Sequence, residues 1–196
     1  SLCLSKKSIV NTSWFVIYSL RVTIPMPKVI PGRFTAEIKE SFVVFSIGMR
    51  VNNIWAIDKW LPTANAMSPM LTALHQYPEK GFLGQESFYR LFPPEVVLIT
   101  YWQSFEHLEH FARNPDDPHL ESWRKFNRSI GSDGSVGIWH ETFLVQPGQY
   151  EAMYANMPLF GLAAATQHVP IVGRRETARR RLGGQNEPAV PSPINP

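Results

Sequence analysis

The order of two hydrophobic periodicities between residues 42 and 145 constrains the fold more than any other feature. Four segments have the alternating or β-branched pattern of strands: residues 42–51, 82–92, 95–102 and 136–145. Between them, apolar side chains recur at helical spacing in residues 58–74, 105–113 and 118–130. The last two segments form one helical region that Asn114 to Asp117 interrupts. The order strand, helix, strand, strand, helix, strand is the split βαβ of a ferredoxin-like α+β fold.

The first strand predicts how the layers pack. One of its faces is wholly apolar and the other is half polar, with Ser46, Gly48 and Arg50 beside Val44. We therefore expect a four-stranded antiparallel sheet with helices on one face. An uncovered, half-apolar second face should not stay in water. The sequence thus predicts that two chains pair sheet to sheet into a dimeric α+β barrel with a cavity between the sheets.

Composition divides the chain into three parts. The first methionine is Met26, and residues 1–26 are expected to be an upstream segment outside the fold. Residues 27–172 form the barrel domain, beginning with a lead-in arm over 29–40. After the last strand we expect a helical turn over 150–155 and a packed arm over 161–166. Arginine, glycine and proline dominate residues 173–196, which predicts a disordered tail.

Charge and motifs exclude several functions. The formal charge of +3 comes from an arginine cluster near the C-terminus, so we expect no nucleic-acid partner. The apolar run over residues 14–20 is too short to span a bilayer. A single cysteine, Cys3, favours a cytoplasmic protein without disulfides. The sequence contains no phosphate loop, nucleophile elbow or zinc spacing.

Four short motifs resemble a known family. They are Val29–Thr35 (VIPGRFT), Phe111–Leu120 (FARNPDDPHL), Gly137–Thr142 (GIWHET) and Tyr154–Pro158 (YANMP). Together they resemble the monooxygenase-like family of dimeric α+β barrels, of the antibiotic-biosynthesis monooxygenase type, and the fumagillin-pathway branch in particular. The resemblance covers roughly residues 27–172. It implies a homodimeric monooxygenase that oxidises a small organic secondary metabolite in its barrel cavity. Some relatives work without a cofactor, whereas others bind haem.

Five residues are candidates for the site. His140 lies within the last strand, where it could be a general base or, if haem is bound, the haem ligand. Arg50 could bind an anionic group of the substrate or pair with the partner chain. Tyr89, Thr100 and Trp102 are expected to line the cavity, unless they are ordinary core residues.

Three alternatives stay open. The first is a haem-binding oxygenase or an aldoxime-dehydratase-like enzyme, with His168 as a second ligand candidate. The second is a protein without catalytic activity, either a small-molecule-binding dimer or a structural dimer whose interior is packed solid by Phe45, Trp102 and Trp139. The third is a metal site at residues 106–110, which we do not expect because these acids and histidines mostly lie on the solvated side of their helix.

Overall fold

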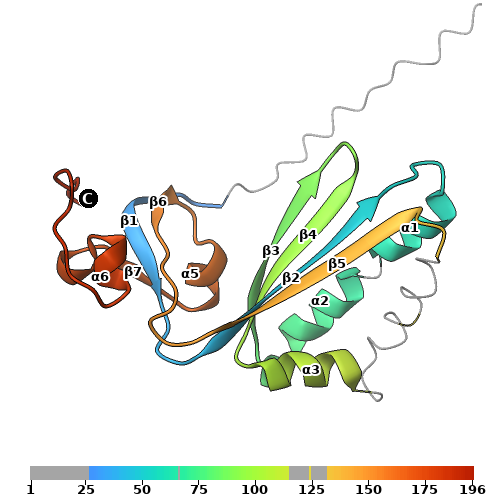
Figure 1. The fold of residues 1–196 in the computed structure, drawn as a ribbon, viewed down its shortest axis with the longest axis horizontal. Coiled ribbons are helices and arrows are strands. Elements are labelled where there is room, and N and C mark those ends of the chain that lie inside the picture. Colours follow the sequence, from blue (N-terminus) through green and yellow to red (C-terminus); the bar gives the residue numbers. More distant parts are fainter. Residues whose placement is uncertain (1–26, 66, 115–123, 125–131) are drawn as a thin grey trace, which may run out of the picture.

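The computed structural model describes residues 27–65, 67–114, 124 and 132–196 (Figure 1). Its main sheet is antiparallel, with the order β3-β4-β2-β5. Its strands are β2 (Phe42–Val51), β3 (Phe82–Arg90), β4 (Glu95–Trp102) and β5 (Val136–Val145). When the four strands are numbered along the chain, their order across the sheet is 2-3-1-4, as in a ferredoxin-like fold. The predicted α+β fold class is therefore confirmed, whereas the pairing of two sheets into a barrel stays a prediction.

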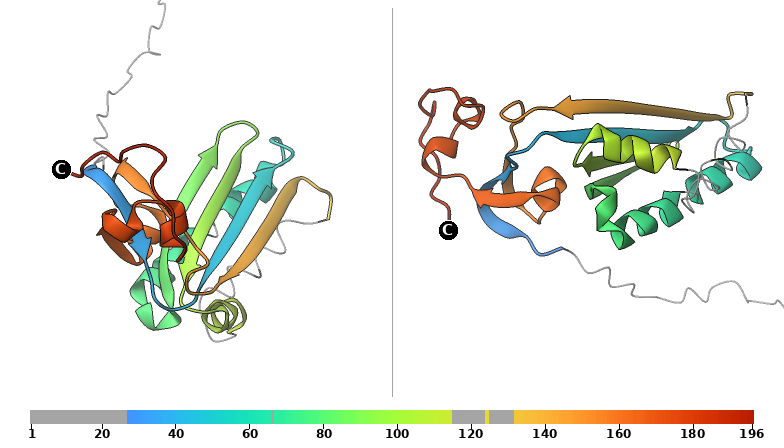
Figure 2. Two further views of the ribbon diagram at one scale, coloured as in Figure 1. Left: turned by 60° about the vertical axis from the view of Figure 1, so that its left-hand side comes forward. Right: turned by 90° about the horizontal axis from the view of Figure 1, so that it is seen from below.

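Three of the described helices lie on one face of this sheet (Figure 2). They are α1 (Ile57–Asn65), α2 (Met67–Gln76) and α3 (Phe105–Arg113), and a short η1 (Pro78–Lys80) precedes β3. The helical pattern over residues 58–74 is divided between two helices, because α1 ends at Asn65 and α2 places Pro69 in its first turn, where proline is tolerated. Ser104 caps α3, since its side chain accepts a hydrogen bond from the His107 amide. The predicted 118–130 helix lies outside the described residues except for Arg124.

The core between helices and sheet follows the predicted apolar face of β2. Val43 and Trp102 from the sheet pack with Met70 and Leu74 of α2 and with Phe111 of α3. The rings of Trp102 and Phe111 lie 5.5 Å apart between centroids. Because the contacts join β2, β4, α2 and α3, this cluster ties together both halves of the split βαβ.

A second, three-stranded sheet was not predicted. Its order is β6-β1-β7, formed by β1 (Ile30–Glu37), β6 (Tyr154–Met157) and β7 (Gln167–Pro170). The expected lead-in arm is thus a paired strand, and the expected helical turn over 150–155 is wrong. Phe34 of β1 pairs with Tyr154 of β6 and with Pro170 of β7, and this pairing satisfies the backbone hydrogen-bonding groups of the three strands. The partners are so far apart in sequence that no local pattern reveals the pairing.

Part of the second sheet face is covered by the chain itself. The short helix α5 (Gly161–Ala165) follows β6, and its Leu162 and Ala163 pack in a cluster with Phe42, Val44 and other residues of this face. At Gly84 of β3, an added Cβ would lie 3.1 Å from the Ala165 Cβ, so this glycine admits the helix. The face expected to be bare is therefore sheltered at one end. We call the remainder the open face; its exposed aromatics include Phe88, Trp139 and Phe143.

Residues 173–196 differ from the expected disordered tail. They form η2 (Gly173–Arg175), α6 (Ala178–Arg181) and an irregular end beside β1 and β7 (Figure 1). The Asn195 side chain donates to the Arg33 carbonyl and accepts from the Arg33 amide, at 2.8 and 2.7 Å. Ion pairs hold the arginines that composition alone assigns to solvent. The predicted upstream segment, residues 1–26, lies outside the described residues.

Candidate functional site

Strand register places four of the five candidate residues on the helix-bearing face. Directly opposed residues of antiparallel strands share a face, and neighbours along a strand alternate. Thr100 lies opposite Phe45, whose side chain packs against the helix-side core. His140 opposes Ile47 on the same face of β2. Tyr89 and Trp102 share this face by the same register.

A cavity lies between this face and the helices. It has a volume of about 100 Å³, and its lining exposes no polar surface. Thr100 and Trp102 form part of its wall with apolar residues of the sheet, α2 and α3; the lining includes Phe45, Ile47, Met67, Met70, Leu71, Leu74, Leu98, Leu108, Phe111 and Ala112. An apolar cavity of roughly 150 Å³ admits benzene. The cavity therefore suits a small apolar group, and two methionines in its wall can adapt their shape.

A buried polar pair supports the cavity wall. The Thr100 hydroxyl donates to the Phe45 carbonyl at 2.9 Å and accepts from the Trp102 indole N–H at 2.9 Å. Both side chains are buried. All their polar atoms are thus used within the protein, which fixes the indole and leaves only apolar surface toward the cavity.

His140 and Tyr89 lie outside the cavity lining. His140 is solvent-exposed, and its ring packs 5.7 Å from the ring of Phe45, which does line the cavity. Tyr89 is 72% exposed near the end of the β3–β4 hairpin. Phe45 thus lies between His140 and the cavity, whereas Tyr89 is on the same face of the sheet but outside the lining.

Arg50 lies on the other side of the sheet. It opposes Glu95 and Gly137, so its side chain projects from the open face, and it is exposed. Glu95 is ion-paired with Arg90 on the same face. Within one chain, Arg50 and the cavity are separated by the thickness of the sheet. The predicted set of five therefore does not meet at one point: Thr100 and Trp102 lie together, His140 is adjacent, and Tyr89 and Arg50 are apart.

A polar cluster on the open face was missed by sequence reasoning. Glu86 of β3 accepts a hydrogen bond of 2.7 Å from the Gly161 amide at the start of α5. The hydroxyls of Tyr101 and Tyr154 approach the same glycine. Burial raises the pKa of Tyr101 to about 12, and the nearby Tyr154 and Glu86 add to the shift. The alternation of β4 places Tyr101 on this face, but no sequence signal reveals α5 docking above it.

The cavity does not fit haem. A porphyrin is several times larger than benzene, which itself occupies a cavity of roughly 150 Å³, whereas this cavity has about 100 Å³ and the described residues of its wall include no histidine. His168 packs against Phe34 in the second sheet, with ring centroids 4.2 Å apart. Among the described residues, no group of three or more histidine, cysteine or acidic side chains is placed to hold a metal ion. Across these residues, too, no helix combines the length and apolarity that crossing a bilayer demands.

Three solved structures with a similar arrangement share little sequence with this chain. An aldoxime dehydratase aligns with a TM-score of 0.49 and 19% identity over 66% of this chain and 41% of that one. SnoaB from Streptomyces nogalater, a cofactor-independent oxygenase, aligns with a TM-score of 0.38 and 12% identity over 53% of this chain and 91% of that one. A monooxygenase from ActVA-Orf6 of Streptomyces coelicolor, solved with nanaomycin D, aligns with a TM-score of 0.35 and 17% identity over 54% of this chain and 88% of that one.

Similarity in sequence is more specific. Monooxygenase af470 of Aspergillus fumigatus is 31% identical over 151 residues, which are 67% of this chain and 53% of that protein. The chain thus spans about half the length of this relative. The family model described as "Monooxygenase af470-like" matches residues 42–162, from β2 through the start of α5. Because this match covers more than half of the chain and the whole ferredoxin-like unit, the chain belongs to the monooxygenase af470-like family.

Proposed function

We propose that this chain is a monooxygenase-type enzyme that oxidises a small apolar organic metabolite in the cavity between sheet and helices. The carrying observation is that the described wall of this cavity presents an apolar surface, because the polar atoms of Thr100 and Trp102 bond within the protein. Such a wall favours an apolar or aromatic ring and excludes water from it. A metabolite larger than benzene requires the side chains of Met67 and Met70 to move.

The chemistry that this wall supports is proton removal and positioning. A substrate that becomes electron-rich on losing a proton can itself reduce dioxygen. For a methylene group oxidised to a carbonyl, one oxygen atom enters the product and the other leaves as water, and all four electrons come from the substrate. His140 is the proposed base, because it is the histidine that packs against the cavity-lining Phe45. A positioned base contributes about 10²–10⁴-fold to such a reaction.

The open face supports the proposed homodimer. Trp139 and Phe143 of β5 and Phe88 of β3 are 36%, 51% and 44% exposed on this face. Apolar patches of this kind mark interfaces. Arg50, on the same face, is then proposed as a rim residue that pairs with the partner chain and has no role toward the cavity.

An oxygen electrode tests the function with a panel of apolar hydroquinones and phenols. We expect oxygen uptake above the protein-free rate for at least one compound. His140→Ala should lower this rate about 10²–10⁴-fold, whereas His110→Ala, on the exposed surface of α3, should leave it within twofold. A panel without any protein-dependent uptake counts against the function, and an active His140→Ala counts against the base.

A blocking variant tests the location. Leu71→Trp places an indole in the cavity from a partly buried position of α2 and should abolish uptake. Leu61→Trp, on the exposed side of α1 and outside the lining, is the matched control. The absorption spectrum of the purified protein tests the haem alternative, for which we expect no Soret band after haem is added. Equal activity of both tryptophan variants would place the reaction elsewhere.

A further inference from the structure

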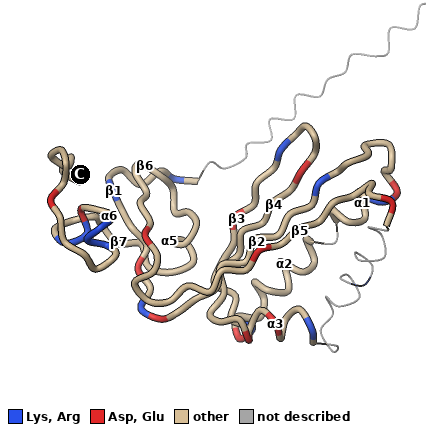
Figure 3. Tube along the Cα trace, viewed as in Figure 1, with Lys and Arg blue, Asp and Glu red and all other residues tan. Residues whose placement is uncertain are grey.

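A charged recess lies far from the proposed active site, between the second sheet and the C-terminal segment. It has a volume of about 440 Å³. Its walls come from β1 and the turn after it, from the residues before β6, and from η2 and α6. Figure 3 shows the blue of Lys and Arg gathered at α6 and the end of β7. A recess of this volume is within the range of small-ligand sites, roughly 300–1,000 Å³.

Cations outnumber anions in its lining. The basic residues are Lys39, Arg174, Arg175, Arg180 and Arg181, whereas the acidic residues are Glu37 and Glu151. Each acid has one arginine partner: Arg175 donates to Glu37 at 2.7 Å, and Arg181 is ion-paired with Glu151. Three cations in the lining are therefore left without a carboxylate of the recess itself.

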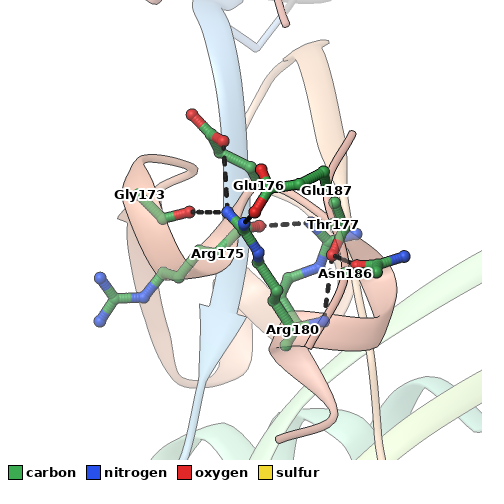
Figure 4. Close-up of polar contacts among 8 residues, drawn as sticks. Gly173, Arg175, Glu176, Thr177, Arg180, Asn186 and Glu187 are labelled. Atoms are coloured by element: carbon green, nitrogen blue, oxygen red, sulfur yellow. Dashed lines mark hydrogen bonds and ion pairs between the residues drawn. The ribbon is translucent and has the colours of Figure 1, made fainter. Parts of the chain in front are cut away.

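Arg180 is held from outside the recess. Its guanidinium donates to Glu187 at 2.5 Å and to the Gly173 carbonyl at 3.4 Å, and Glu176 lies 3.6 Å away (Figure 4). Thr177, the N-cap of α6, accepts from the Arg180 amide and so fixes the base of the side chain. The arginine is only 21% exposed, so its position is set by the protein and not by solvent.

Arg174 and Lys39 have no ion-pair partner among the described residues. Both are exposed and line the recess, Arg174 from η2 and Lys39 from the turn after β1. The other three arginines pair with four carboxylates, those of Glu37, Glu151, Glu176 and Glu187, so Arg174 and Lys39 are the two lining cations still available to an anionic ligand. Guanidinium groups match the oxygens of phosphate in pairs, which favours a phosphate-bearing ligand over a halide or a single carboxylate.

We propose that this recess binds a compact soluble polyanion, specifically a diphosphate group, with Arg174 and Lys39 as its direct contacts. Arg175, Arg180 and Arg181 position the C-terminal segment through their carboxylate partners. The site is independent of the proposed oxidation, because no residue of its lining reaches the cavity beside Thr100. Its affinity should fall as ionic strength rises, since the recess is open to solvent.

Titration calorimetry of the whole chain with inorganic pyrophosphate tests the site, and a second arm uses ADP to present the same group on a nucleoside. We expect one molecule bound per chain in at least one arm. Arg174→Ala and Lys39→Ala should each raise the dissociation constant at least about tenfold, because each removes one charge-assisted hydrogen bond to the ligand. The matched control is Arg179→Ala, because Arg179 belongs to the same helix as Arg180 but lies outside the lining.

The two outcomes are distinct. Loss of binding in both recess variants, with Arg179→Ala within twofold of the unchanged protein, supports the site. Absence of heat with both ligands at millimolar concentration overturns it. An equal loss in Arg179→Ala also overturns it, because binding would then follow net charge alone. Circular dichroism of each variant checks that the fold is kept, and neither Arg174 nor Lys39 forms an ion pair with a described residue that its removal would break.

Discussion

Replacing Thr100 by valine probes the buried polar pair of the cavity wall. The substitution keeps nearly the same side-chain volume but removes the hydroxyl that accepts from Trp102 and donates to Phe45. Trp102 is only 2% exposed, so its indole N–H would be left buried without an acceptor. An unsatisfied buried donor costs roughly 1–3 kcal/mol. We therefore expect the free energy of unfolding to fall by about 2 kcal/mol.

Urea denaturation followed by far-UV circular dichroism measures this loss. With an m-value of about 2 kcal/mol/M, the unfolding midpoint should move down by about 1 M. Thr142→Val is the control, because Thr142 flanks Phe45 on the same rung but is exposed. Its effect should stay within about 0.5 kcal/mol.

A second background separates the hydrogen bond from general packing. In Trp102→Phe the indole N–H is gone, so Thr100→Val should cost less than half of what it costs in the unchanged protein. An equal cost in both backgrounds, or a midpoint shift below about 0.2 M in the first, would refute the claim that the pair is satisfied only internally.

Three further changes follow from the contacts. Hydrogen bonds from Lys59 and Ser135 lower the pKa of the Asp133 carboxyl from 3.8 to about 2, so the ionised carboxylate stabilises the fold above about pH 4 and this stability is lost as the pH falls toward 2. Asp133→Asn should remove this contribution, and acid unfolding curves of the two proteins measure the difference. Phe143→Glu should weaken self-association, whereas Leu144→Glu, exposed on the opposite face of β5, should not; sedimentation velocity compares them. Gly84→Leu should push α5 off the sheet and speed proteolysis after residue 145, which an unchanged digestion pattern would contradict.

Periodicity sufficed for the ferredoxin-like unit because its signals are local. Each strand from β2 to β5 carries its own alternation, and the helix break before Pro69 and the cap at Ser104 depend on neighbours within four residues. The same local rules failed at the second sheet. β6 and β7 have only four residues each, and both pair with β1 across more than 100 residues of sequence, which no local window of residues reveals.

Arginine content misled in a similar way. A segment rich in arginine and proline has the composition of a disordered tail, yet Glu37 and Glu151 hold Arg175 and Arg181 in place. These acids are distant from the arginines in sequence, and only the folded chain brings them into contact. Composition counts charges but does not say which of them meet.

The amino-acid order by itself determined the fold class, the two unlike faces of the sheet and the family resemblance, because each depends on residue identity along a short stretch of chain. Tertiary structure decided which face carries the cavity. Thr100, Trp102 and His140 were candidates by type and alternation, but only strand register shows that they share the helix side, while Arg50 lies on the other. Alternation divides a strand into two faces; only packing tells which face is covered, and by what.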